Sequence, residues 1–184
     1  MRLAIFYSGI IIFFGIHLVP LIGKLRALLK DRLGEGPYLV LFSLISLTGF
    51  LLIIFGYESN SNFQYSINGK AYVYAKYIMF FALTLNIAAV MPTYIKKYTK
   101  HPMSLGIAIW AVSHLLVNPD TVSIILFGSF LTFSCLSVIV AELRESVSEV
   151  IPKIHYDIFS IVLGIALTFL AYNFHEYLSG VKLT

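Results

Sequence analysis

Two histidines lie inside apolar stretches of the chain, where their rings could ligate a metal. His17 lies in the run IIFFGIHLVP, and His114 lies in the run GIAIWAVSHLLVN. An ionisable ring at membrane depth is costly, so such residues tend to face the interior of a helix bundle and to carry a function. Neutral imidazole is a common ligand of heme iron and other metals. On position alone, a second interpretation stays open, in which each ring only hydrogen-bonds between helices.

Three further histidines are closer to the ends of apolar stretches. His155 stands beside Asp157 at the start of the last stretch, where we expect a solvated residue. His101 precedes a proline and is expected to cap a helix or to contact a headgroup phosphate. His175, in the run YNFHEYL, is either an interfacial residue of an aromatic belt or a ligand.

The neighbours of His114 suggest how its ring would be surrounded. Trp110 and Asn118 stand four residues before and after it, so on a helix both share its face. An aromatic ring and an amide are therefore expected to flank the imidazole as a second layer around any bound group.

The composition places these histidines in a membrane. Of 184 residues, 59% are hydrophobic and 12% are charged, and the mean hydropathy is +0.87; soluble domains have roughly a quarter of their residues charged. A membrane-spanning helix needs about 20 apolar residues. The sequence therefore predicts an all-α, polytopic bundle of about six transmembrane helices, near residues 2–23, 37–57, 72–95, 102–118, 121–142 and 155–178.

The basic residues predict the orientation of this bundle. Lysines and arginines gather in the segments 24–36, 96–101 and 143–154, whereas the segments 58–71 and 118–120 are polar and nearly free of charge. By the positive-inside rule the basic segments face the cytoplasm and both termini face outwards, most simply in a bacterial inner membrane. The formal charge of +4 is thus a topology signal, and no contiguous basic surface indicates nucleic-acid binding.

Several classes of enzyme and transporter lack support in the sequence. It contains no phosphate-binding glycine loop, no nucleophile elbow and no paired cysteine ligands. The acidic residues lie at or near the ends of the expected spans, which argues against a proton-coupled transporter. The expected partners are the lipid bilayer and a hydrophobic small molecule, and the sequence names no protein partner.

Long stretches of the chain resemble the NnrU family of bacterial membrane proteins. The domain of this family is shared with the zeta-carotene cis-trans isomerases of plants and cyanobacteria. The similar stretches are FFGIHLVP at 13–20, RLGEGPYLVLFSLISLTG at 32–49, AAVMPTYIKKYTKHPMSLGIAIWAVSHLLVNPD at 88–120, LFGSFL at 126–131 and IVLGIALTFLAYNFHEYLSGV at 161–181. The resemblance covers nearly the whole chain, so we expect a single NnrU-like transmembrane domain over residues 1–184.

The resemblance implies a heme b held between two histidines, which fall by motif on His17 and His114. In the isomerase branch, the reduced iron is thought to lose one axial ligand and then to engage a polyene, so that its central cis double bond can rotate. This implies a redox-gated isomerase for a hydrophobic polyene such as zeta-carotene. Two alternatives stay open: a non-catalytic membrane protein that supports nitrite or nitric oxide metabolism in denitrification, and a small-molecule permease with structural histidines.

The depth of the two residues keeps another ligand pair open. At about 1.5 Å per residue, His17 lies roughly 9 Å and His114 roughly 18 Å from the cytoplasmic ends of their helices. A heme between them would have to lie obliquely. His175, near the outer face, is therefore the alternative partner of His114.

Overall fold

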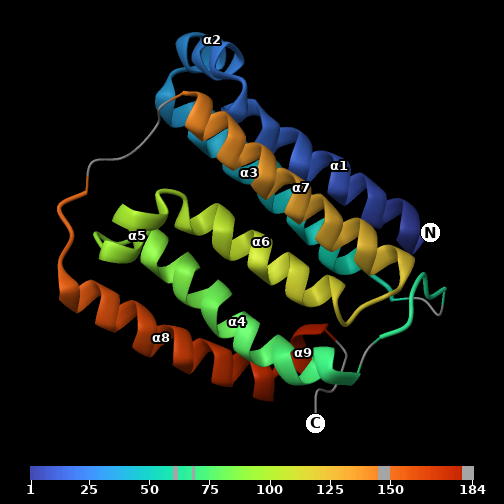
Figure 1. The fold of residues 1–184 in the computed structure, drawn as a ribbon. Helices are drawn as coiled ribbons and strands as arrows, with labels where there is room; N and C mark the ends of the chain where they lie inside the picture. Colours follow the sequence, from blue (N-terminus) through green and yellow to red (C-terminus); the bar gives the residue numbers. More distant parts are fainter. Residues whose placement is uncertain (60–61, 68, 145–149, 180–184) are drawn as a thin grey trace. The chain divides into compact units, whose positions relative to one another are not determined.

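The computed structural model describes residues 1–59, 62–67, 69–144 and 150–179, and every regular element within these ranges is a helix (Figure 1). Five of the described helices are long and apolar enough to cross a membrane: α1 (Arg2–Leu21), α3 (Glu35–Gly56), α4 (Gly69–Ala89), α7 (Thr121–Leu143) and α8 (Ile154–Asn173). A sixth apolar helix, α6 (Pro102–Leu115), has 14 residues. The chain is therefore an all-α integral membrane protein with about six spans, as its sequence predicts.

Three short helices complete the described elements: α2 (Gly23–Leu33), α5 (Tyr94–Thr99) and α9 (His175–Ser179). Two of them divide spans that the sequence predicts as continuous. The span expected at 72–95 ends at Ala89, before Pro92, which has no N–H for a helical hydrogen bond. The span expected at 155–178 ends at Asn173, and α9 follows. Residues 60–61, 68 and 145–149 of the predicted connecting segments lie outside the described residues.

The described chain forms two compact units, which we treat separately. Unit 1 comprises Met1–Asn62 and Asp120–Ser129, and unit 2 comprises Phe63–Pro119 and Phe130–Thr184. The first part of α7 thus belongs to unit 1 and the remainder to unit 2. The single domain over 1–184 stays a prediction.

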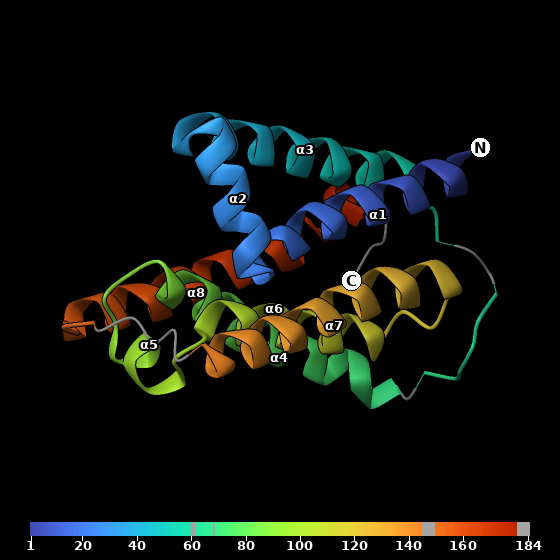
Figure 2. The same cartoon turned by 90° about the horizontal axis from the view of Figure 1, so that it is seen from above.

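In unit 1, glycines allow α1 and α3 to pack closely. Figure 2 shows these two helices side by side, with α2 as the connection between them. A Cβ atom on Gly9 would lie 2.6 Å from the backbone nitrogen of Ile53, and one on Gly49 would lie 2.6 Å from that of Phe13. Small residues bring membrane helices into backbone contact in this way.

The start of α7 is held to the end of α3 by polar groups within unit 1. Asp120 is 2% exposed. Its carboxylate accepts hydrogen bonds from the N–H and the hydroxyl of Ser123, and the hydroxyls of Ser123 and Tyr57 lie 2.8 Å apart. Because the first N–H groups of a helix have no intrahelical acceptor, the Asp120 side chain satisfies one of them.

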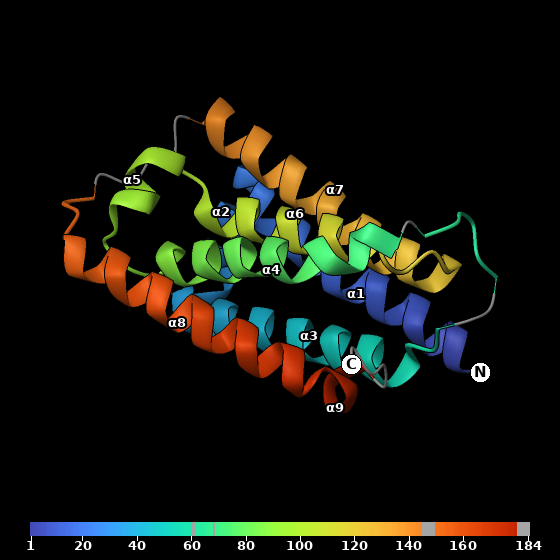
Figure 3. The ribbon, with the colours of Figure 1, turned by 60° about the horizontal axis from the view of Figure 1, so that its bottom comes forward.

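In unit 2, α4 lies between α6 and α8 (Figure 3). Gly106 of α6 faces the backbone of α4, because a Cβ atom there would lie 2.8 Å from the carbonyl oxygen of Ala82. The same carbonyl accepts a hydrogen bond from the Asn86 amide at 2.9 Å. Asn86 is the main uncharged polar residue inside its span. Its side-chain amide therefore donates a hydrogen bond within its own helix, at the contact between α4 and α6.

Asp157 of α8 holds together the end of unit 2 that carries the lysines of α5. Its two carboxylate oxygens accept hydrogen bonds from the N–H groups of Tyr94 and Ile95, both at 2.9 Å. The N–H of Lys153 donates to the carbonyl of Pro92 at 3.0 Å. These bonds join the start of α5 to the start of α8.

Candidate functional site

His114 stands in the last turn of α6 with its ring oriented by a backbone hydrogen bond. Its Nδ1 atom lies 2.9 Å from the carbonyl oxygen of Trp110, one turn earlier. The Trp110 indole packs against the imidazole, with ring centroids 4.9 Å apart and planes inclined by 51°. The indole in turn meets Phe130 edge to face at 5.1 Å. Trp110 therefore restricts the ring through both its carbonyl group and its side chain.

This hydrogen bond also fixes which ring nitrogen carries a lone pair. A carbonyl oxygen can only accept a hydrogen bond, so Nδ1 of His114 must carry the hydrogen. In the neutral ring the lone pair then lies on Nε2. Metal-binding histidines are commonly oriented by such a bond from the ring nitrogen that does not bind the metal.

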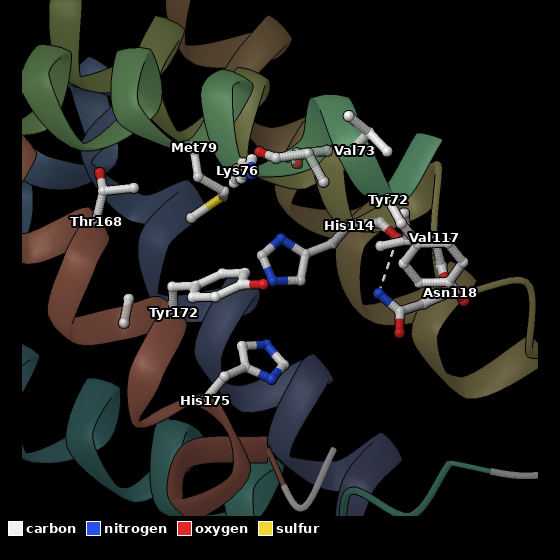
Figure 4. A pocket seen from close by; sticks show the side chains of 13 residues that line it. Tyr72, Val73, Lys76, Met79, His114, Val117, Asn118, Thr168, Tyr172 and His175 are labelled. Carbon is white, nitrogen blue, oxygen red and sulfur yellow. Dashed lines mark hydrogen bonds between the residues drawn. The ribbon is translucent and has the colours of Figure 1, made fainter. Parts of the chain in front are cut away.

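His114 lines a cavity of about 350 Å³ within unit 2. Figure 4 shows that the rings of His114 and His175 point into the same space, and that the hydroxyl of Tyr172 is directed towards the His114 ring. His175 begins α9, directly after the turn that ends α8. The cavity thus joins residues from four helices, and its other described walls are mainly contributed by α4 and α8, including Lys76, Met79 and Thr168.

Hydrogen bonds from two tyrosines hold the C-terminal end of α6 and the turn after it, beside this cavity. The hydroxyl of Tyr65 donates to the carbonyls of Leu115 and Asn118, and that of Tyr72 donates to the carbonyl of Val117 at 3.4 Å. The last carbonyls of a helix have no intrahelical donor, so Tyr65 satisfies the carbonyl of Leu115, the last residue of α6, and the other two acceptors lie in the turn that follows.

Asn118 lies next to His114 but contacts its backbone. The Asn118 amide donates to the carbonyl oxygen of His114 at 2.9 Å, as the dashed line in Figure 4 marks. Of the two residues expected to flank the imidazole, Trp110 packs on the ring itself, whereas Asn118 closes the end of the helix and lines the same cavity.

His17 lies in unit 1 and is oriented in the same manner as His114. Its Nδ1 atom lies 2.6 Å from the carbonyl oxygen of Phe13, one turn earlier on α1. Its ring lies between two phenylalanines, with centroid distances of 4.2 Å to Phe13 and 5.3 Å to Phe42. By the same reasoning, Nδ1 carries the hydrogen and Nε2 the lone pair. Because His17 and His114 belong to different units, their pairing stays a prediction.

The two remaining histidines lie outside the cavity. His155 is exposed at the start of α8, where a solvated residue was expected. His101 stands at the N-cap of α6 without capping it, and its Nε2 atom lies 3.0 Å from the Glu142 carboxylate. Among the residues that the structure describes, no three His, Cys, Asp or Glu side chains gather to hold a metal ion.

The cavity residues absent from the predicted site include Lys76, Tyr72 and Tyr172. The sequence could have identified Lys76 as a candidate, because a lysine inside an apolar span is costly and marks a functional position by default. It could not have identified the tyrosines, since tyrosine near a span end is equally typical of an interfacial belt.

The family comparison matches nearly the whole chain. The family model described as NnrU protein covers residues 5–183, which include all the histidines discussed above. No curated protein matches the chain, and no solved structure does.

Proposed function

The chain belongs to the NnrU protein family, and we propose that it is an integral membrane protein that binds heme b with His114 as one axial ligand. The family resemblance favours His17 as the second ligand. The shared cavity favours His175 in that position. The experiment below separates the two.

The observation that carries this proposal is the orientation of the two imidazoles. In both His17 and His114, Nδ1 donates to the carbonyl four residues earlier, at 2.6 Å and 2.9 Å. Each neutral ring therefore has its lone pair at Nε2, away from its own helix backbone. Nε2 is therefore the ring atom that would bind iron in both residues.

The donor chemistry suits heme. Two neutral imidazoles are a common axial pair for heme iron, which takes its remaining ligands from the macrocycle, so no third protein ligand is required. The cavity beside His114 has a volume of about 350 Å³, within the range of roughly 300–1,000 Å³ common for small-molecule sites. The sequence has no CxxCH motif, so the heme would be held non-covalently.

The bound group would supply an iron centre with an axial position that can be exchanged. The protein would hold this group through His114, restrain the ring with Trp110, and keep water away with the aromatic and aliphatic side chains of α4 and α8. A hydrophobic polyene such as zeta-carotene could reach such a site from the bilayer, so we propose redox-gated cis-trans isomerisation as the reaction. Nitric oxide is the alternative ligand, in a non-catalytic role in nitrogen-oxide metabolism.

Absorption spectra of the purified protein, oxidised and reduced, test the proposal. We expect a low-spin spectrum in the full chain, and five-coordinate or absent heme in the His114→Ala variant. The His17→Ala variant should behave in the same way if the resemblance gives the correct pair. The His175→Ala variant should do so if the cavity does. The His155→Ala variant is the matched control, since that ring is exposed.

Two results would contradict the proposal, the first by excluding heme and the second by excluding His114 as its ligand. One is a colourless preparation from heme-sufficient cells that stays unchanged when hemin is added, which would favour a permease with structural histidines. The other is low-spin heme that survives His114→Ala. A spectrum that remains six-coordinate on reduction and ignores carbon monoxide would argue against isomerisation and nitric oxide binding alike.

A further inference from the structure

Two cavities adjoin along α4 and α8 in unit 2. The first is the histidine-lined cavity of about 350 Å³, and the second is a groove of about 560 Å³. Lys76, Thr168 and Tyr172 line both of them. A single ligand could therefore extend from one into the other.

The two cavities differ in chemistry. The groove is lined further along by Tyr77, Phe80, Ile165 and Phe169, which are aromatic or aliphatic. The side chains of Tyr77 and Phe169 are 56% and 67% exposed, so this face of the membrane-spanning helices borders lipid. The histidine-lined cavity contains imidazole, amide and hydroxyl groups. The two cavities thus meet at Lys76, and the groove is the less polar of them, although Asn173 also lines it.

Lys76 is the one charged side chain among the described residues that line either cavity, and no described lining residue is acidic. Its Nζ atom lies 5.2 Å from the centroid of the Tyr77 ring. Among the described residues, no carboxylate forms an ion pair with it. A cation inside a membrane span normally has an anionic partner or serves a pathway.

The depth of Lys76 limits what that partner can be. It stands seven residues after Gly69, the first residue of α4, or about 10 Å along the helix. The 21 residues of α4 match a hydrocarbon core of about 30 Å, and phospholipid headgroups lie outside this core. An anionic group that meets Lys76 at this depth therefore belongs to a molecule that can enter the cavity, whereas a Lys76 side chain extended towards the start of α4 would meet headgroups at the interface.

We propose that Lys76 marks a binding site for a long-chain fatty acid. The carboxylate pairs with Nζ of Lys76 where the cavities meet, and the acyl chain lies in the groove between α4 and α8. The site does not depend on heme, because it consists of Lys76 and the groove. The Nε2 atoms of the histidines take no part in it.

Binding of a fluorescent long-chain fatty acid and its methyl ester to the full chain in detergent tests the proposal. The acid should bind at least about tenfold more tightly than the ester, since only the acid carries a charge. Lys76→Met should remove this difference, whereas Lys76→Arg should keep most of it. Lys70→Met is the matched control on the same helix, because Lys70 lines neither cavity.

A second pair of variants tests the groove. Ile165→Trp should weaken binding of the acid and the ester alike by narrowing the groove. Leu167→Trp, which changes a residue of α8 that lines neither cavity, should leave both unchanged.

Several results would overturn the proposal. Equal affinity of the unmodified chain for acid and ester would do so without any variant, and this comparison holds even if Lys76→Met fails to fold. Unchanged binding in a folded Lys76→Met variant would show that the Lys76 ammonium group extends to the membrane–water interface and does not bind the acid. Competition by hemin, with loss of heme in Lys76→Met, would assign the lysine to a heme propionate. Equal competition by an anionic phospholipid would exclude a site specific for a single chain.

Discussion

At the scale of single residues, Asp157 makes a testable contribution to stability. It is 6% exposed and accepts hydrogen bonds from two backbone N–H groups at the start of α5. Replacing it with alanine would leave two part-buried N–H donors without this acceptor, at a cost of up to about 1–3 kcal/mol each. We expect the thermal unfolding temperature of Asp157→Ala in detergent to fall by several degrees.

Two variants make the Asp157 test specific. Asp157→Asn keeps one acceptor oxygen and should be intermediate in stability. Asp31→Ala removes an exposed carboxylate from α2 and should unfold at nearly the same temperature as the unmodified protein. Equal unfolding temperatures for Asp157→Ala and Asp31→Ala would show that the two hydrogen bonds do not hold α5 to α8.

The sequence predicts single residues of the site better than their grouping. His17 and His114 stand out because an ionisable ring interrupts an apolar run, and both have the same backbone-bonded orientation. No spacing in the sequence, however, reveals that Lys76, His114 and Tyr172 line one cavity, since they come from three helices that are far apart along the chain. The hydrogen bonds of Asp157 likewise reach residues more than sixty positions away.

At the scale of helices, the glycines of unit 1 predict which substitutions break the α1–α3 contact. A Cβ atom on Gly9 would lie 2.6 Å from a backbone atom of α3, whereas one on Gly15 of the same helix would meet nothing within 4 Å. Gly9→Ala should therefore destabilise the protein by about 1–3 kcal/mol, because overpacking displaces the backbone. Gly15→Ala should be neutral or slightly stabilising, because alanine favours a helix.

Thermal unfolding of both glycine variants in the same detergent measures this difference. If Gly9→Ala unfolds at the same temperature as Gly15→Ala, the close approach of α1 and α3 is wrong. The lack of space at Gly49 offers an independent check, since Gly49→Ala should behave like Gly9→Ala.

Hydropathy predicts the spans but not where helices turn within apolar sequence. The span expected at 102–118 ends as α6 at Leu115, and the next residues form the turn to which Tyr65 and Tyr72 donate. Those tyrosines precede the carbonyls to which they donate by 53 and 45 residues. The end of the helix therefore depends on distant donors that satisfy its carbonyls, and a local window of sequence does not contain them.

At the scale of the whole molecule, the two ends of each unit differ in their content of basic residues. In unit 1 the guanidinium of Arg2 lies 3.6 Å from the Glu58 carboxylate, so the first residues of α1 and the last of α3 share one end. The basic helix α2 follows the other end of α1. In unit 2, the lysines of α5 lie beside the start of α8, whereas the histidine-lined cavity includes the end of α8 and the start of α9. This pattern agrees with basic ends in the cytoplasm.

Labelling of single cysteines in intact cells tests this orientation. Cys135 is the one cysteine of the sequence and is exposed, so it is first replaced by serine. In that background, Ser59→Cys should react with a membrane-impermeant maleimide, because Ser59 is exposed in the base-poor segment after α3. Lys97→Cys, exposed on α5, should react only after the cells are opened.

The same labelling result also shows on which side of the membrane the histidine-lined cavity lies. Since this cavity lies at the end of unit 2 away from α5, the expected result would place it towards the outer face. Labelling of Lys97→Cys but not Ser59→Cys in intact cells would invert the topology and place the cavity towards the cytoplasm.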